Sequence, residues 1–206
     1  MTTTLYYVHD PMCSWCWAFR PTLDALLHAL PADIRVKKLL GGLAADTEEP
    51  MPEEMRERLQ QTWKRIEQNV PGMHFNFDFW SNNTPRRATY PACRAVLAAR
   101  EQGCDEAMLQ AIQRAYYQQA RNPSDTSTLM ELATEIGLDT PVFGQALTSE
   151  RIQQQLEAEM AEAEAIGVDS YPSLVLEVNG NRWPVPIDYI NADNLLANIH
   201  WLLEEA

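Results

Sequence analysis

The sequence predicts an α/β protein in which a helical domain is inserted between the two halves of a smaller, sheet-containing domain. Three observations predict this fold class. A strand-like run, a C-x-x-C motif and a helix-like segment follow one another within the first 30 residues. A long stretch of helical sequence follows the next strand-like run. Strand character then returns near residue 173, with a hairpin signal and a final amphipathic segment.

The first predicted elements form a strand, a helix and a second strand. Residues 5–8, Leu-Tyr-Tyr-Val, are expected to form a buried strand, because aromatic and β-branched side chains favour strands. A helix is predicted at residues 17–30, where four leucines recur at helical spacing: Leu23, Leu26, Leu27 and Leu30. The second strand is predicted at residues 34–40, and glycines 41 and 42 end it.

The middle of the chain is predicted to be almost entirely helical, with Pro and Gly residues at the helix boundaries. The expected helices are residues 52–69, 91–101, 106–119, 126–136, 141–147 and 150–166. The aromatic-rich residues 73–83 are expected to form a loop. Apolar stripes on the helices indicate a packed domain, not a linker.

The last part of the chain returns to strands. Residues 173–178 and 182–185 are predicted strands, and Asn179-Gly180 between them is a strong hairpin signal. A final helix is predicted at residues 191–205. Without the inserted helices, the order is βαβ-αββα, which is similar to that of the thioredoxin fold. We therefore predict a thioredoxin-like domain of residues 1–45 and 149–206, and a helical insertion domain of residues 46–148.

Charge and hydropathy exclude some classes of partner. The chain has 206 residues and a formal net charge of −13, which argues against nucleic acid and anionic membranes, because both attract basic patches. No apolar run approaches the ~20 residues that a membrane span needs. Residues 1–4 lack the basic region and apolar core of a signal peptide. We therefore expect a cytoplasmic protein.

The candidate catalytic residues are Cys13 and Cys16, which form the C-x-x-C motif where the first strand gives way to a helix. A helix N-terminus stabilises a thiolate through its partial positive charge. We expect Cys13 to be the nucleophile at the exposed start of the helix and Cys16, one turn further in, to be the resolving thiol. Zinc binding is the alternative, but Cys93 and Cys104 make a poor second pair of ligands within helical sequence.

The other two cysteines and two residues just before the motif are further candidates for a role. Cys93 and Cys104 are expected to be small buried apolar residues, with a second, regulatory disulfide as the alternative. His9 and Asp10 directly precede the motif and could tune the pKa of the thiols or relay protons to Cys16. The alternatives are an ordinary strand-end residue for His9 and a turn residue for Asp10.

Two segments resemble the DsbA family of thiol–disulfide oxidoreductases: residues 9–19, HDPMCSWCWAF, and residues 167–175, GVDSYPSLV. Within the family, the chain is most similar to a cytoplasmic branch of FrnE-like proteins and predicted protein-disulfide isomerases. The resemblance implies that Pro172 is a cis-proline that precedes the third core strand and faces the redox cysteines. A trans-proline at the start of an edge strand is the alternative.

The resemblance also implies a set of substrate-binding residues around the cysteines: Ser14, Trp15, Tyr171 and Pro172. The rings of Trp15 and Tyr171 would form an apolar floor for a peptide or for glutathione, unless they serve packing alone.

Two positions differ from the pattern of the family. Periplasmic DsbA proteins usually have Pro-His between the cysteines, where this chain has Ser14-Trp15. Many thioredoxin-like proteins have a buried acid six residues before the first cysteine, where this chain has Tyr7. Because Ser14 and Trp15 bring no charge to the Cys13 thiolate, we expect a reduction potential between about −270 mV, as in thioredoxin, and about −120 mV, as in DsbA.

Together these features predict a thiol–disulfide oxidoreductase or isomerase. No metal or organic cofactor is expected, because the dithiol is itself the redox group. The expected partners are protein thiols and disulfides, with glutathione or a thioredoxin-type protein exchanging electrons. The alternatives are a glutathione-dependent transferase or isomerase of the kappa-class type, which would not need Cys16, and a redox-switched binding module. The direction of electron flow, the natural substrate and the oligomeric state do not follow from the sequence.

Overall fold

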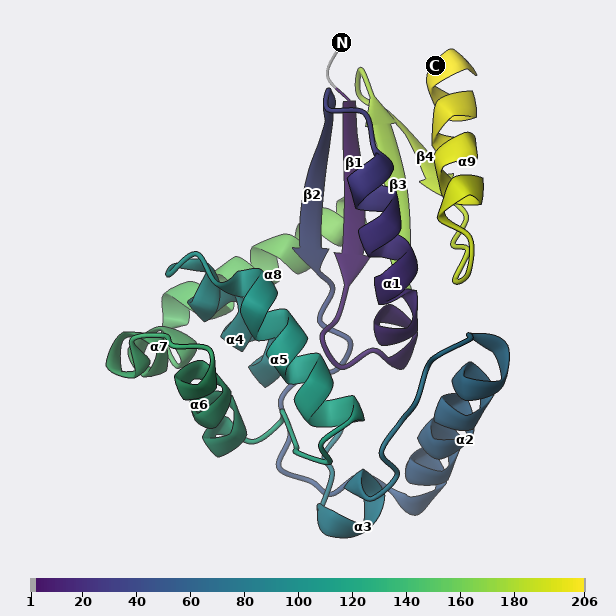
Figure 1. The fold of residues 1–206 in the computed structure, drawn as a ribbon. Helices are drawn as coiled ribbons and strands as arrows, with labels where there is room; N and C mark the ends of the chain where they lie inside the picture. Colours follow the sequence, from purple (N-terminus) through teal and green to yellow (C-terminus); the bar gives the residue numbers. More distant parts are fainter. Residues whose placement is uncertain (1–2, 206) are drawn as a thin grey trace.

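A four-stranded sheet with the strand order β2-β1-β3-β4 forms the centre of the upper part of the molecule (Figure 1). The computed structural model describes residues 3–205, so Met1 and Thr2, on which the signal-peptide expectation partly rests, lie outside it. The central strand β1 (Thr3–His9) runs parallel to β2 (Ile34–Leu40) and antiparallel to β3 (Ser173–Val178). The strand β4 (Asn181–Val185) pairs with β3 at the other edge.

Helices cover both faces of the sheet (Figure 1). On one face, α1 (Ser14–Ala29) and α9 (Ala192–Glu205) pack against alternate side chains of β1, such as Tyr7. On the other face, α8 (Glu150–Ala165) packs against the intervening side chains, such as Val8. This alternation is the two-residue period of a buried strand. The predicted α/β class with a thioredoxin-like sheet and a helical insertion is confirmed.

The insertion lies on the side of the sheet where β1 and β2 end. Its helices are α2 (Glu53–Asn69), α3 (Phe79–Asn82), α4 (Tyr90–Arg100), α5 (Asp105–Tyr117), α6 (Thr126–Glu135) and α7 (Thr140–Leu147). The helices α4 to α7 form an arm on one side, and α2 and α3 lie on the other (Figure 1). One apolar core runs through these helices and also includes Met12, Leu40 and Ile152. The domain boundaries after residues 45 and 148 therefore stay a prediction. No helix among the described residues is long and apolar enough to span a membrane.

Three local details refine the predicted elements. The first helix begins at Ser14 and not at residue 17, so Cys16 lies within its first turn. A short helix, α3, forms within the stretch predicted to be a loop, because its buried Phe79 packs against the ring of Trp63. The hairpin at Asn179-Gly180 is confirmed by positive φ angles of 51° and 89°, as in a type I′ turn.

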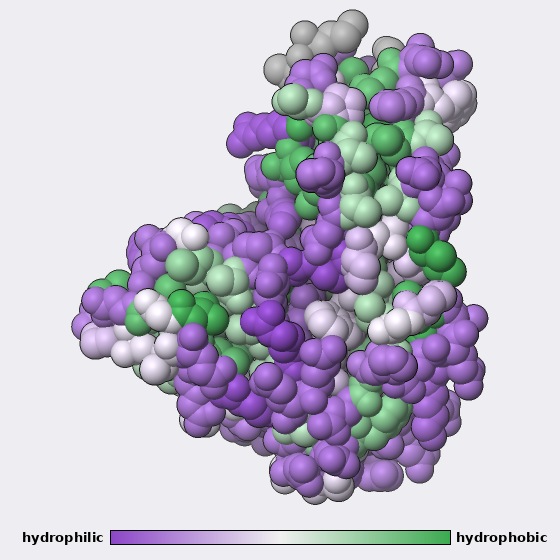
Figure 2. Space-filling view, viewed as in Figure 1, coloured by the Kyte–Doolittle hydropathy of each residue, from purple (hydrophilic) through white to green (hydrophobic). Residues whose placement is uncertain are grey.

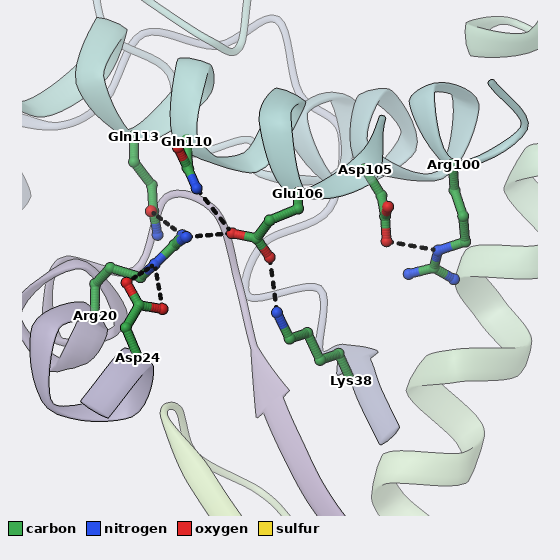
Figure 3. A network of polar contacts seen from close by, with 8 residues as sticks. All are labelled: Arg20, Asp24, Lys38, Arg100, Asp105, Glu106, Gln110 and Gln113. Atoms are coloured by element: carbon green, nitrogen blue, oxygen red, sulfur yellow. Dashed lines mark hydrogen bonds and ion pairs between the residues drawn. The ribbon is translucent and has the colours of Figure 1, made fainter. Parts of the chain in front are cut away.

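A polar network joins the insertion to the sheet and to α1 (Figure 3). Glu106 on α5 accepts hydrogen bonds from Arg20 of α1 and from Lys38 of β2, the latter at 2.7 Å. Burial opposes the ionisation of Glu106, but the hydrogen bond from Lys38 and the charges of Lys38 and Arg20 outweigh it and lower the pKa of Glu106 to about 2. The ionised carboxylate therefore holds three elements together.

Candidate active site

The two cysteines of the motif lie at the N-terminus of α1, where the sheet meets the insertion. Cys13 is the N-cap of the helix, and its carbonyl accepts a hydrogen bond from the Trp17 N–H at 3.0 Å. Both thiols are free. Cys13 is only 7% exposed and Cys16 is fully buried. The expectation of an exposed Cys13 is wrong, because the loop that carries Tyr171 packs against its sulfur.

Hydrogen bonding and burial make the two thiols unlike each other. The hydrogen bond from the Cys16 thiol lowers the pKa of Cys13, against the opposing effect of burial, and the backbone N–H groups of Cys16 and Trp15 add to this lowering. Burial raises the pKa of Cys16 well above its usual value. The thiolate is therefore favoured on Cys13, and the proton stays on Cys16.

The loop before β3 lies directly against Cys13. The peptide bond between Tyr171 and Pro172 is cis. The Cys13 thiol donates a hydrogen bond to the Tyr171 carbonyl at 3.4 Å. The Tyr171 hydroxyl donates to the Gly41 carbonyl at 2.7 Å, and a Cβ on Gly41 would lie 2.1 Å from the tyrosine ring. Only a glycine after β2 therefore allows this ring to pack closely and hold the loop against Cys13.

Asp10 connects the motif to two other segments. Its buried carboxylate accepts hydrogen bonds from the backbone N–H of Met12 and of Leu43, both at 2.8 Å, and from the Thr89 hydroxyl at 2.6 Å. The Cys93 thiol donates a fourth hydrogen bond at 3.5 Å. Burial raises the pKa of Asp10. The bond to Met12 agrees with the alternative of a turn residue, and the bonds to Leu43 and Thr89 were not predicted.

His9 is buried at the end of β1. Its ring stacks on that of Tyr7, with centroids 4.8 Å apart, and burial lowers its pKa to about 3. It is therefore neutral at pH 7, and its Nδ1 has no hydrogen-bond partner among residues 3–205. Burial, followed by the nearby Cys16 and Cys13, raises the pKa of Tyr7, which stands where many thioredoxin-like proteins have a buried acid. A role for His9 in tuning the thiols stays a prediction.

A pocket of about 360 Å³ opens beside Cys13. The C-x-x-C loop, Leu43 and the loop of residues 169–171 form one part of its lining. The other part consists of side chains from the insertion: Leu59, Thr62, Arg87 and Tyr116. A larger pocket, of about 530 Å³, lies at the C-terminal end of α8 beside β3 and β4 and contains neither cysteine. The smaller pocket is therefore the candidate substrate site.

The two residues between the cysteines contact partners that are distant in the sequence. The Ser14 hydroxyl accepts a hydrogen bond from the indole N–H of Trp63 at 2.9 Å. The ring centroids of Trp15 and Tyr189 are 4.9 Å apart. The guanidinium of Arg65 lies 5.5 Å from the centroid of the Trp15 ring. Sequence reasoning missed Trp63, Arg65 and Tyr189, because no local pattern connects them with the motif.

The remaining cysteines lie outside the pocket. Cys93 is buried, as predicted. Cys104 is only half-buried, and the prediction of its burial is wrong, because it is the N-cap of α5, where the chain turns between two helices. No group of three or more His, Cys, Asp or Glu side chains among residues 3–205 is arranged to hold a metal ion.

The fold and the paired cysteines define a thioredoxin-like protein with a dithiol site. Residues 4–194 match the family of the DSBA-like thioredoxin domain, and the chain belongs to this family.

Two solved structures resemble the chain over nearly its full length. A candidate protein disulfide isomerase from Nitrosomonas europaea is 27% identical, with a TM-score of 0.84, and the alignment covers 100% of this chain and 99% of that one. The cytosolic disulfide reductase DsbM from Pseudomonas aeruginosa is 26% identical, with a TM-score of 0.77 and coverage of 98% and 100%. DsbM has also been solved with GSH, and that structure is 25% identical, with a TM-score of 0.73 and coverage of 98% and 99%.

One relative in sequence is named as an adapter protein and not as an oxidoreductase. The ClpXP adapter protein SpxH from Halalkalibacterium halodurans is 26% identical over 177 residues, which are 83% of this chain and 57% of that protein. The chain therefore spans little more than half the length of this relative.

Proposed function

We propose that this protein is a thiol–disulfide oxidoreductase that exchanges disulfides with protein or glutathione substrates through Cys13 and Cys16. The observation that carries the proposal is the asymmetry of the two thiols beside a pocket. Cys13 has the lowered pKa and lines the pocket, whereas Cys16 is buried and has the raised pKa. A nucleophile and a resolving thiol need this difference.

In the direction that reduces a substrate disulfide and oxidises the protein, the Cys13 thiolate attacks one sulfur of that disulfide. The substrate S–S bond breaks, the other substrate sulfur leaves as a thiolate and takes up a proton, and a mixed disulfide forms. Cys16 then loses its proton and attacks Cys13, which releases the second substrate sulfur and forms the Cys13–Cys16 disulfide. The substrate gains two electrons and the protein loses two. Glutathione, or a thioredoxin-type protein, returns them by the reverse exchange.

The residues around Cys13 are proposed to position the substrate. The Tyr171 backbone lies against the nucleophile, and Pro172 has no N–H that could donate a hydrogen bond near the sulfurs. Trp15 provides apolar surface on the pocket wall, and Ser14 lies between the two cysteines. The similarity to a cytosolic disulfide reductase supports a cytoplasmic protein that works with glutathione.

The experiment that tests the proposal is equilibration of the protein in glutathione redox buffers, followed by tryptophan fluorescence. Trp15 and Trp17 flank Cys16 and should report the change. We expect a two-electron transition between about −180 and −230 mV. The absence of a transition, with one glutathione adduct on Cys13, would contradict the proposal and indicate the transferase reaction instead.

A second test of the proposal is to trap the mixed disulfide between Cys13 and a substrate. A Cys16→Ser variant should accumulate a mixed disulfide on Cys13 that mass spectrometry detects, because the resolving thiol is missing. The Cys13→Ser variant is the matched control and should form no adduct. A kappa-type transferase would instead retain its activity in Cys16→Ser.

A second candidate function is a redox-switched binding module. The observation in its favour is the 26% identity to a protein described as a ClpXP adapter. A protein that acts only by binding should retain its activity in the Cys13→Ser, Cys16→Ser double variant. Loss of activity in the double variant would favour the oxidoreductase.

A further inference from the structure

We propose that Arg87 and Arg65 form a carboxylate-recognition site at the pocket beside Cys13, and that this site selects small thiols with carboxylate groups, the class to which glutathione belongs. The inference rests on the proposed function and names the substrate class of the same pocket. The observation behind it is that two arginines near Cys13 form no ion pair within the described part of the chain.

Arg87 is the one cationic residue in the lining of the pocket, and it comes from the segment before α4. It is half-buried and forms no ion pair with another residue in the range 3–205. The neighbouring Arg86, in contrast, forms ion pairs with Glu48 and with Asp125, the latter at 2.7 Å. Asp169 is the one acidic residue of the lining, and it is exposed. Asp169 forms no ion pair with Arg87, so this half-buried guanidinium can bind a carboxylate of a ligand.

Arg65 adds a second positive charge at the same pocket. Its guanidinium lies over the ring of Trp15, a lining residue. On α2, Thr62 lines the pocket, and Arg58 and Arg65 flank it at positions i−4 and i+3 of the same helix face. Most of the visible surface where α2 and α3 lie is hydrophilic, with a smaller hydrophobic patch within it (Figure 2).

The basic side chains that lack an ion pair are a minority in this acidic chain. The formal net charge is −13, and most basic side chains are in ion pairs. Among the described residues, the Lys and Arg side chains without an ion pair are Arg35, Arg58, Lys64, Arg65, Arg87 and Arg114. Four of these belong to α2 or to the pocket lining. The helix α2 carries four acidic and four basic side chains, so what distinguishes the pocket is the position of Arg87 in its lining and of Arg65 over Trp15, and not a net positive charge.

The site would act on the step that reduces the oxidised protein. A glutathione thiolate attacks Cys13, the Cys13–Cys16 bond breaks, and Cys16 leaves as a thiolate that takes up a proton. A second glutathione thiolate attacks the glutathione sulfur of the mixed disulfide and releases Cys13 as a thiolate. Two glutathione molecules lose two electrons and become the disulfide, and the protein gains them. A guanidinium–carboxylate contact holds the incoming thiol beside Cys13 and so raises the rate of attack.

The test compares two reductants of the oxidised protein by stopped-flow tryptophan fluorescence. Glutathione carries two carboxylates, and its dimethyl ester carries none. In Arg87→Gln the second-order rate constant with glutathione should fall about tenfold at low salt, the size of one lost charge-assisted contact. The rate constant with the ester should stay within about twofold. Arg65→Gln should show a smaller loss of the same kind, because Arg65 is more exposed.

Arg35→Gln is the matched control, because Arg35 is also unpaired but lies at the far end of β2, and it should react like the wild type. An Arg87→Gln rate equal to that of the wild type, or an equal fall with both reductants, would overturn the inference but leave the proposed function standing. If the oxidised wild type reacts with neither reductant, the inference fails together with the glutathione part of the proposed function, and a thioredoxin-type protein would have to supply the electrons.

Discussion

Asp10 shows how much a single buried residue determines at this site. Its carboxylate holds the C-x-x-C loop, the loop after β2 and the start of α4 through hydrogen bonds from Met12, Leu43 and Thr89. Its negative charge also raises the pKa of Cys13, against the lowering effect of the Cys16 thiol. The hydrogen bonds of Asp10 hold the loop that carries Cys13, whereas its charge acts on the pKa of Cys13. A substitution that removes the charge but keeps the shape can separate the two effects.

Replacement of Asp10 by Asn should have two effects. Loss of the charge should shift the alkylation profile of Cys13 with iodoacetamide to lower pH, because a charge that opposes the thiolate is gone. An amide has one acceptor oxygen and leaves buried donors unpaired, so urea unfolding should show a destabilisation of about 1–3 kcal/mol.

Asp24→Asn is the control for this prediction, because Asp24 is an exposed acid on α1, the helix that carries Cys16, and it should change neither quantity by much. An alkylation profile of Asp10→Asn identical to that of the wild type would show that the charge of Asp10 does not reach Cys13.

At the scale of elements, one hydrogen bond connects the first turn of α1 to the inserted helix α2. The indole N–H of the fully buried Trp63 donates to Ser14, the residue after Cys13. Trp63 is surrounded by aromatic rings of the insertion, among them Phe75 and Tyr116. The position of the motif is therefore tied to the packing of the insertion.

A Trp63→Phe substitution should slow the exchange reaction of Cys13 with a small aromatic disulfide several-fold, because the ring stays but the hydrogen bond to Ser14 is lost. Trp80→Phe is the matched control in the same cluster, because the indole N–H of Trp80 has no partner among the described residues. Both variants should lose about 1–3 kcal/mol of stability.

A double-mutant cycle with Ser14→Ala should give a coupling energy in the range of about 0.5–3 kcal/mol. Equal slowing in the two tryptophan variants would mean that packing alone, and not the hydrogen bond, acts on Cys13.

At the scale of the whole molecule, Glu106 links the insertion to the thioredoxin-like part. Its pKa of about 2 lies below the ~4.3 of an unfolded glutamate. Because the folded-state pKa is lowered, the ionised group contributes stability that is fully present above the unfolded value. This contribution is lost as the pH falls through 4.3 toward 2.

Glu106→Gln should therefore be less stable than the wild type by about 1 kcal/mol at pH 7, a modest value because the side chain is 41% exposed. The difference in urea unfolding should shrink between pH 4 and pH 2. Glu131→Gln, which breaks an exposed ion pair within the insertion, is the control and should cost less at pH 7. A difference that does not change between pH 7 and pH 2 would contradict the assigned ion pairs.

The sequence was enough to predict the fold class, the order of the elements and the candidate nucleophile. These features depend on local patterns: the period of apolar residues, the Gly and Pro residues at element ends, and the spacing of two cysteines. The strands at residues 34–40 and 173–178 have the predicted bounds. The resemblance to the family relied on two short segments, and the family match covers both.

Only the tertiary structure decided what surrounds Cys13. Thr89, Trp63 and Arg87 reach the site from the insertion, more than 45 residues along the chain from the motif. The same packing buries Cys13 against the Tyr171 loop. A local pattern cannot encode these contacts, because they arise when the helices and the sheet pack on a common core. The sequence alone thus determined the redox chemistry to expect, whereas tertiary packing decided its surroundings: the Tyr171 loop buries Cys13, the buried Cys16 thiol sets the pKa order, and the insertion brings Arg87 to the pocket.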